Sequence, residues 1–494
     1  MLNKSKLFLT LFTCLTVVAC SDSDDDNPAG GVDNKSTGTG NVRVIHASPD
    51  APAVNILLSG SSAIQNLDYA KSSGFANVSA DTYAVSVEAI TASGNAEVIN
   101  VPALTITDNS KTTVIAVGAV KAEAGNDILL EAITVNDSDA TPTAMQVAIR
   151  VVHASPAAAG LGNVDIYVTA PGADLTAAAP ITLSYKQDAD ASAIPIDSYQ
   201  IRITPNGNAS TVLYDSGSID LTAFGGQKLL IAAMDTTSDT TGDATSGAPV
   251  KLLVATDSDQ LILFDESTKV GARVLHLSPD AASAAGGPVE VFATVNGTSS
   301  VELIPSFNYT DAVPAIDSYV SVDPASYVFD VAPNTDSIID SVYQSAALDL
   351  SKGSEYSVIA AGYVTKGPAF RLLATKDDNR SIATHAKVKV VHAAAVVDSV
   401  EVYVNESGSA TKTDIEARMF SPLLDNFNFA DITDYVSVSE GTYDIRVLDK
   451  TSGTVVINVE NVAINNGDVI TAIAYGPDES DNDPAAPGLK LLTN

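Results

Sequence analysis

The sequence has almost no cysteine, and none beyond its first twenty residues. The two cysteines are Cys14 and Cys20. The rest of the chain therefore cannot form disulfide bonds and must be held together by apolar burial. Burial is sufficient for domains of roughly 110 residues, because a domain of that size removes about two thirds of its unfolded surface from water.

Basic residues are also scarce. The chain has 26 Lys and Arg against 60 Asp and Glu, for a formal net charge of −34. Such a surface repels nucleic acid and anionic lipid headgroups, so we expect no nucleic-acid partner. Long apolar runs are missing after the first twenty residues, and helical periodicity is nowhere sustained. These absences argue against membrane-spanning helices and against a helical fold.

The N-terminus has the layout of a secretory signal. Lys4 and Lys6 precede an apolar run at 7–18, which is too short to cross a bilayer. The run ends in Val-Val-Ala-Cys at Cys20, which resembles the bacterial lipobox. By that resemblance residues 1–19 are a lipoprotein signal peptide, and acylated Cys20 anchors the chain in a lipid bilayer. The alternative is an ordinary cleaved signal with an incidental cysteine.

Residues 20–40 form a tether rich in Asp, Gly and Ser, which we expect to be a solvated spacer. Ser21 follows the anchor cysteine. By resemblance to lipoprotein sorting rules, a residue other than Asp at that place favours the outer membrane. The predicted location is therefore the cell outer membrane, on its periplasmic or its exposed side.

One segment occurs four times in the remaining chain, which predicts four tandem domains. Its copies are VRVIHASPD (42–50), IRVVHASPA (149–157), ARVLHLSPD (272–280) and VKVVHAAAV (388–396). We assign the repeats to residues 41–139, 146–259, 270–378 and 386–494.

Each copy continues with the same series of short, β-branched, alternating runs, separated by Gly, Asn, Asp, Pro and Ser. A second run begins at Val54, Val164, Val289 and Val400, and a later one begins with Thr-Tyr or Ser-Tyr. Seven or so short strands in about 110 residues predict an all-β fold of four tandem immunoglobulin-like antiparallel β-sandwich domains.

The R-V-x-H-A-S-P opening, the V-[DE]-V-Y second strand and the G-T-Y strand resemble the bacterial domain of unknown function 4397. The resemblance covers most of residues 42–494 and implies an exported β-sandwich module without a known activity. Two departures stand out. The fourth repeat has Ala394 and Ala395 where the others have Ser-Pro, and the second has Ala191 where the others have an aromatic residue. Those aromatic residues are Phe75, Tyr319 and Tyr435.

Four histidines close the apolar stripe of the opening strands: His46, His153, His276 and His392. We expect each to be buried and bonded to backbone in the following turn, since further metal ligands at suitable spacing are lacking. A hydrolase would have to pair Ser48 with His46 and Asp50. The Ser-Pro-Asp sequence instead favours a turn, so we predict no catalytic residues and no enzyme.

The opposite face of the opening strand carries a recurring basic residue: Arg43, Arg150, Arg273 and Lys389. The second strand carries Asn55, Asp165, Glu290 and Glu401 on its outward face. If the two strands pair antiparallel, these side chains face each other and fix the register.

Aromatic residues on that outward face could stack on a sugar or dock a partner chain. The candidate binding residues are Tyr167, Phe292 and Tyr403. The alternative is that an Arg stem or a crossing loop covers them. A second aromatic set, Tyr83, Tyr199, Tyr327 and Tyr443, resembles the tyrosine corner of sandwich folds, whose hydroxyl bonds to upstream backbone.

Acidic residues cluster at the repeat junctions. Asp137, Asp139, Asp257 and Asp259 are candidate calcium ligands, although no Asp-x-Asp-x-Asp-Gly loop is present. No other cofactor is expected. Two functions stay open: a non-enzymatic envelope rod for adhesion or scaffolding, and a lipoprotein that binds glycan or peptide through outward aromatics. A hydrolase is disfavoured.

Overall fold

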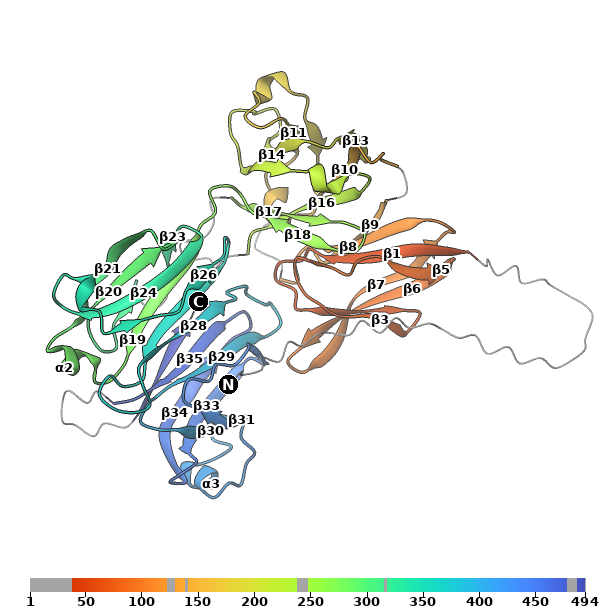
Figure 1. The fold of residues 1–494 in the computed structure, drawn as a ribbon. Helices are drawn as coiled ribbons and strands as arrows, with labels where there is room; N and C mark the ends of the chain where they lie inside the picture. The colour runs from red at the N-terminus through yellow and green to blue at the C-terminus, as the bar shows by residue number, and fades with distance from the viewer. Residues whose placement is uncertain are drawn as a thin grey trace, which may run out of the picture. The chain divides into compact units, whose positions relative to one another are not determined.

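The computed structural model describes residues 38–121, 129–137, 141–237, 248–314, 318–477 and 487–493. Each repeat folds into two β-sheets whose apolar faces enclose a core (Figure 1). The predicted all-β sandwiches are confirmed at this level. No helix among these residues has the length and apolar character needed to cross a membrane.

The first repeat shows the arrangement most simply. Its first sheet has the order β4 (Lys71–Ser72), β1 (Thr39–His46), β8 (Lys111–Val117), β9 (Glu131–Asn136), with β5 (Ala76–Ser79) also paired to β1. Its second sheet has the order β3 (Ser61–Leu67), β2 (Val54–Leu58), β6 (Asp81–Thr91), β7 (Gly94–Ile106).

The second repeat extends the same plan. Its first sheet runs β13 (Ser192–Pro195), β10 (Gln146–His153), β16 (Lys228–Asp235), β17 (Val250–Ala255), β18 (Gln260–Leu263). Its second sheet runs β12 (Ile181–Leu183), β11 (Val164–Thr169), β14 (Ser198–Pro205), β15 (Tyr214–Asp220). The short helices are α1 (Pro156–Ala159), η1 (Leu175–Ala177) and η2 (Thr222–Phe224).

In the third repeat the first sheet is β22 (Ala312–Val313), β19 (Val270–Leu277), β27 (Glu355–Ala361), β28 (Arg371–Asp377), with β23 (Val320–Val322) on β19. The second is β21 (Ser299–Phe307), β20 (Val289–Val295), β24 (Ala325–Pro333), β25 (Tyr343–Gln344), with β26 (Leu348–Leu350) on β24. The helices are α2 (Ala281–Ala285) and η3 (Ile338–Asp340).

The fourth repeat has β32 (Val436–Val438), β29 (Ala386–Ala393), β35 (Val469–Tyr475), β36 (Gly488–Thr493) in one sheet. The other contains β31 (Leu424–Asn428), β30 (Ser399–Glu406), β33 (Gly441–Asp449), β34 (Thr454–Ile464). One helix, α3 (Lys412–Glu416), begins with a capping box at Thr411 and Asp414.

Strand order separates these sandwiches from the expected immunoglobulin arrangement, in which the first two strands share a sheet. Here β1 and β2 lie in different sheets, and β1 pairs in parallel with β8, with Val44 opposite Val114. The parallel pair recurs as β10 with β16, β19 with β27 and β29 with β35. The immunoglobulin-like expectation therefore holds only as far as the two-sheet sandwich.

The tyrosine corners are confirmed in all four repeats. Each hydroxyl donates to the carbonyl four residues upstream, at 2.8–3.0 Å: Tyr83 to Ser79, Tyr199 to Pro195, Tyr327 to Asp323 and Tyr443 to Ser439. The bond fastens the start of one strand to the chain that enters it, as the sequence pattern predicts.

The described residues belong to one compact unit, Thr37–Asn494, and the repeats are joined in pairs by apolar contacts. One cluster combines Ile45 and Ile115 of the first repeat with Val152 and Leu253 of the second. In Figure 1 the strands β1, β8 and β9 accordingly lie beside β16, β17 and β18. The sheet faces that carry the recurring basic residues are thus covered by another repeat.

The third and fourth repeats pair in the same way. Their shared cluster includes Leu275 and Ile359 from one repeat and Val391 and Ile473 from the other. All four side chains are fully buried. Each pair of sandwiches therefore has a third apolar layer between its two members, in addition to the core inside each sandwich.

Candidate functional site: buried ionic clusters between repeats

The recurring basic residues of the opening strands lie in the interfaces between paired repeats. Arg43, Arg150, Arg273 and Lys389 are all buried, with 0–5% of each residue exposed. A buried cation needs a nearby anion and hydrogen-bond acceptors, because burial alone strongly disfavours the charge. In each interface the anion is an aspartate at the end of the last strand of the first or the third repeat, and hydrogen-bond acceptors lie beside it.

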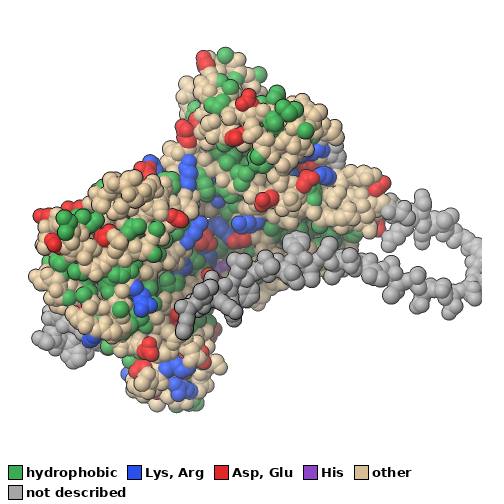
Figure 2. All heavy atoms as spheres, in the orientation of Figure 1, with side chains coloured by type: hydrophobic (Ala, Val, Ile, Leu, Met, Phe, Trp, Pro, Cys, Tyr) green, Lys and Arg blue, Asp and Glu red, His purple; other side chains and the backbone are tan. Residues whose placement is uncertain are grey.

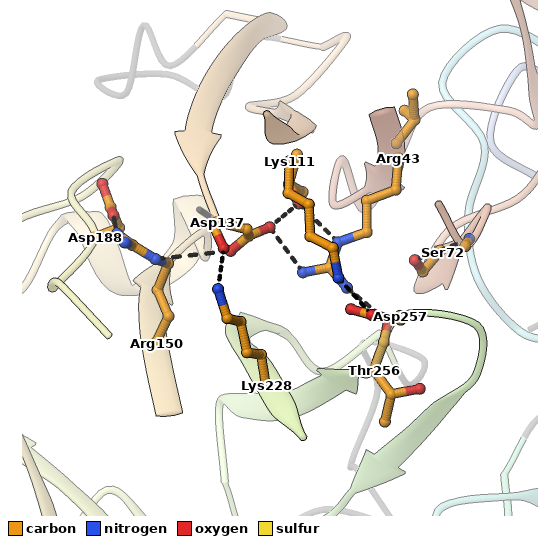
Figure 3. Close-up of polar contacts among 12 residues, drawn as sticks. Arg43, Ser72, Lys111, Asp137, Arg150, Asp188, Lys228, Thr256 and Asp257 are labelled. Atoms are coloured by element: carbon orange, nitrogen blue, oxygen red, sulfur yellow. Dashed lines mark hydrogen bonds and ion pairs between the residues drawn. The ribbon is translucent and has the colours of Figure 1, made fainter. Parts of the chain in front are cut away.

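Asp137 is the anion of the first interface (Figure 3). It follows β9 directly, and its Oδ2 lies 3.0 Å from Nη2 of Arg43. From the other side, Nε of Arg150 in the second repeat lies 3.7 Å from Oδ1. The ammonium group of Lys228 donates to the backbone carbonyl of Asp137 at 2.8 Å. One carboxylate therefore joins cations from two repeats.

Arg43 is held by a full set of acceptors. Its Nε donates to Oγ1 of Thr113 at 2.7 Å, and Thr113 in turn donates to Asp137. Its Nη1 crosses the interface to the carbonyl of Thr256 at 2.7 Å. Burial lowers the pKa of Arg43, while the charge and hydrogen bond of Asp137 oppose that shift.

The second interface repeats this geometry around Asp377, which is the last residue of β28. Arg273 Nη2 lies 3.4 Å from Oδ2, and Lys389 Nζ of the fourth repeat lies 3.3 Å from Oδ1. Ser357 takes the place of Thr113: it accepts from Arg273 at 2.6 Å and donates to Asp377 at 2.5 Å. Register explains the recurrence, because Arg43 lies opposite Thr113 and Arg273 opposite Ser357 in the parallel strand pairs.

Aromatic rings cover three of the four cations. The Cζ of Arg43 lies 4.5 Å from the centre of the Phe75 ring, that of Arg273 lies 4.6 Å from Tyr319, and Nζ of Lys389 lies 4.5 Å from Tyr435. These distances permit cation–π attraction. The second repeat has Ala191 at this position, and Arg150 binds Asp188 instead. The departure noticed in the sequence thus coincides with a different partner for the basic residue.

The predicted pairing of these basic residues with the second strand is wrong. Asn55, Asp165, Glu290 and Glu401 lie in the other sheet of each sandwich. Because the first and second strands do not pair, no base can face an acid across that ladder. The true partner Asp137 lies 94 residues from Arg43. A signal for it was present in the sequence, since Asp137 and Asp377 both lie at the end of the last strand-like run of a repeat.

The outward aromatics that were candidates for binding are covered, which is the alternative that the sequence left open. Tyr167, Phe292 and Tyr403 are only 4%, 6% and 1% exposed. Tyr403 packs under α3, against Ala410 and Ile415, and its hydroxyl donates to Glu401 at 2.6 Å. The alternative of a covering segment is therefore confirmed for Tyr403. None of the three rings offers a free face on which a sugar could stack.

The candidate calcium ligands are not brought together. Asp137 lies among cations, as described above, and Asp257 forms an ion pair with Lys111. Asp259 is exposed and accepts from the backbone N–H of Gln260 at 2.8 Å. Asp139 lies outside the described residues. The carboxylate of Asp137 balances two buried bases, so the structure gives it a role different from metal binding.

A different acidic group forms in the third repeat. Glu290, Glu302 and Asp336 bring carboxylate oxygens within 4.8 Å of one another. Glu290 is fully buried, and both of its oxygens accept from the N–H of Asp336 at 3.1 Å. Carboxylate oxygens are the ligands that hard cations such as Ca²⁺ prefer. The sequence pattern indicated Glu290 only as a residue that fixes strand register, and it did not predict this group.

The four histidines of the opening strands are buried as predicted, each about 1% exposed. The predicted bond to the following turn is present in two repeats: the N–H of Ser48 donates to Nδ1 of His46 at 3.3 Å, and Ser278 does the same for His276. His46 Nε2 also lies 3.0 Å from the carbonyl oxygen of Pro52.

The ring of His153 forms no hydrogen bond to any described residue, so the predicted turn bond is absent there. The ring of His392 lies near the backbone of Val397, in the segment that follows its strand. Both side chains contact aromatic rings, Tyr185 at 5.7 Å and Phe427 at 6.1 Å between ring centres. Burial lowers the pKa of each imidazole to about 4. These two histidines are therefore neutral core residues at pH 7.

The residues considered for a nucleophile do not form one. The hydroxyl of Ser48 has no hydrogen bond to a described residue, so it is not bonded to His46. Asp50 accepts from the backbone N–H groups of Val120 and Lys121 at 2.8 Å each. Its carboxylate fastens two loops and does not orient an imidazole.

These observations define the class of protein: an all-β chain of repeated sandwiches, joined pairwise by buried ionic clusters. The chain belongs to the family described as domain of unknown function (DUF4397), which matches residues 40–167, 270–403 and 386–489. No curated protein matches the chain. One similar solved structure is the Bacillus anthracis TIE protein, at 9% identity over 90% of this chain and 69% of that one, with a TM-score of 0.15.

Proposed function

We propose that this chain is a non-enzymatic lipoprotein of the outer membrane, anchored through acylated Cys20, which displays its paired sandwiches for adhesion or scaffolding. One observation carries the proposal. The basic residues that recur at the start of every repeat are buried, and Arg43 pairs with Asp137 where two repeats meet. These contacts support a role in repeat pairing and do not resemble an active site repeated in each domain.

Pairing suits a display role. The shared apolar cluster and the buried ionic cluster fix two sandwiches to each other, so a surface built from both keeps one geometry. The lipobox-like sequence and the tether at 20–40 support attachment at a distance from a bilayer. The sequence-predicted aromatic row is buried, so the glycan- or peptide-binding alternative loses the residues proposed for it.

The anchor is tested by replacing Cys20. Cells producing the wild type or Cys20→Ser are grown with radiolabelled palmitate, and their membranes are separated on a density gradient. We expect label in the wild type, recovered with the outer membrane, and none in Cys20→Ser, which should appear in the soluble fraction. An unlabelled wild type would contradict the proposal, as would a membrane-bound Cys20→Ser protein.

The display role is tested on intact cells. Proteinase K added outside should degrade the anchored repeats while a periplasmic marker stays intact. Full protection of the repeats would place them in the periplasm and contradict adhesion.

A further inference from the structure

A cavity of about 320 Å³ lies where the first three repeats approach one another. It is lined by residues 68–71 of the first repeat and Lys251 of the second. Residues 353–355 of the third repeat and residues 376–380, at its end and in the following linker, complete the lining. The volume is within the range of small-molecule sites. Figure 2 shows basic and acidic side chains crowded together in the hollow at the centre of that face.

Tyr69 provides an aromatic wall that two cations approach. Lys251 Nζ lies 4.6 Å from the ring centre, and Cζ of Arg380 lies 5.5 Å from it. The ring is fixed in place, because it is buried and its hydroxyl donates to the carbonyl of Asp235 at 2.5 Å. These contacts hold positive charge at the cavity lining in a chain whose net charge is −34.

The acidic residues of the lining are already engaged. Oδ1 of Asp68 lies 2.5 Å from Nη2 of Arg380, and Oδ2 of Asp378 lies 2.7 Å from Nζ of Lys387. Asp377 belongs to the ionic cluster with Arg273 and Lys389. Glu355 accepts a hydrogen bond from Asn379. Three of these four carboxylates are therefore paired with other cations, and only Glu355 has a neutral partner.

Three lysines of the lining have no carboxylate within ion-pair distance among the described residues. Lys71, Lys251 and Lys376 form no ion pair and no hydrogen bond through Nζ with any of the residues that the structure describes. The hydroxyl-bearing residues Thr268 and Ser354 line the same space. Ammonium and hydroxyl donors around one cavity match the acceptor oxygens of an oxyanion.

We propose that this cavity binds a small anionic ligand through carboxylate or phosphate oxygens, with Lys251 as its principal contact and Lys71 and Lys376 at its rim. This site does not depend on the proposed display function. Desolvation by burial and the nearby charge of Arg380 lower the pKa of Lys251 to about 8, although Asp378 and Asp235 raise it. A bound anion would compensate the buried ammonium, so binding and protonation of Lys251 favour each other.

Binding is measured by isothermal titration on the full-length protein at pH 7 and constant ionic strength. The probes are inorganic phosphate and citrate, which distinguish a phosphate from a carboxylate site, and chloride serves as the reference. We expect one of the two to bind with a Kd in the millimolar range or below. Lys251→Met should weaken that binding at least tenfold, and Lys376→Met by a smaller factor.

The matched control is Lys412→Met, since Lys412 is exposed and its ion pair with Glu416 lies on another surface. It should bind as the wild type does. A melting temperature close to that of the wild type shows that the Lys251 variant is folded, and Lys251→Arg should retain most of the affinity. The proposal is overturned if neither anion binds more tightly than about 10 mM, or if Lys251→Met and the wild type bind equally.

Discussion

Arg43 in the first repeat donates a 2.7 Å hydrogen bond to the backbone carbonyl of Thr256 in the second, 213 residues away. The bond crosses the interface beside Asp137, whose carboxylate also contacts Arg150 of the second repeat. A side chain that recurs at the start of every repeat thus participates in joining repeats. The same relation between Arg273, Asp377 and Lys389 indicates that two-repeat pairs are the structural unit.

Removal of the shared carboxylate should be costly. Asp137→Ala leaves Arg43 buried without its counter-ion, and loss of one partner of a buried pair costs about 3–5 kcal/mol. We expect the free energy of unfolding of the first two repeats to fall by that amount, measured by urea denaturation. Asp257→Ala is the control: its pair with Lys111 is partly exposed and should contribute at most about 1 kcal/mol. Equal losses in the two variants would show that the cluster does not stabilise the interface.

In the second ionic cluster, the contribution of the Tyr319 ring can be measured separately from that of its hydroxyl. Tyr319→Phe keeps the ring over Arg273 but removes the hydroxyl that donates to Asp377 at 2.9 Å. A hydrogen bond to a charged group contributes about 1.5–3 kcal/mol, so the third and fourth repeats should lose stability of that size. Tyr475→Phe is a suitable control, because the Tyr475 hydroxyl has no hydrogen bond to a described residue. Unchanged stability in Tyr319→Phe would mean that Tyr319 stabilises the cluster through its ring alone.

The sequence predicted features that depend on one strand and its alternation. His46 and Val44 share the core face because side chains alternate, and Tyr443 forms its corner with a residue only four positions away. Strand order was not predictable in this way. An alternating pattern shows which face of a strand is buried, but it does not identify the neighbouring strand, so Arg43 was assigned to the wrong partner.

The segment that buries the outward aromatics could not be identified for a related reason. Parity correctly places Tyr403 on the face of β30 opposite the core, yet it cannot show what covers that face. The segment that does so, α3, begins at Lys412 and presents Ile415 to the ring. The acids at the repeat ends were considered as calcium ligands, whereas the partner of Asp137 is Arg43, which lies 94 residues away in the sequence.

Acid should destabilise the protein through two of its histidines. The pKa of His153 and of His392 is about 4 in the folded chain and about 6.5 when unfolded. Below pH 6.5 the unfolded state binds more protons, so the contribution of each neutral imidazole is full above pH 6.5 and is lost as the pH falls toward 4. When the pH is below both pKa values, the free energy of unfolding has fallen by about 3 kcal/mol for each histidine.

The test compares urea unfolding of the wild type and His392→Phe between pH 7 and pH 4. The variant should lose less stability over that range, since one titrating group is gone and Phe can pack beside Phe427. His153→Phe should reduce the pH dependence by a similar amount in the second repeat. Parallel stability curves for variant and wild type would mean that His392 does not titrate in this window.

The four tyrosine corners should contribute independently, because each lies in its own sandwich. Tyr443→Phe removes a 3.0 Å bond to the carbonyl of Ser439 and should lower the free energy of unfolding by about 0.5–1.5 kcal/mol. Since distant sites are additive, Tyr83→Phe combined with Tyr443→Phe should lose the sum of the two single effects within about 0.5 kcal/mol. Tyr167→Phe removes a hydroxyl that is bonded to no described residue and should change stability little. A loss in Tyr167→Phe as large as in Tyr443→Phe would show that the effect comes from tyrosine replacement in general and not from the corner bond.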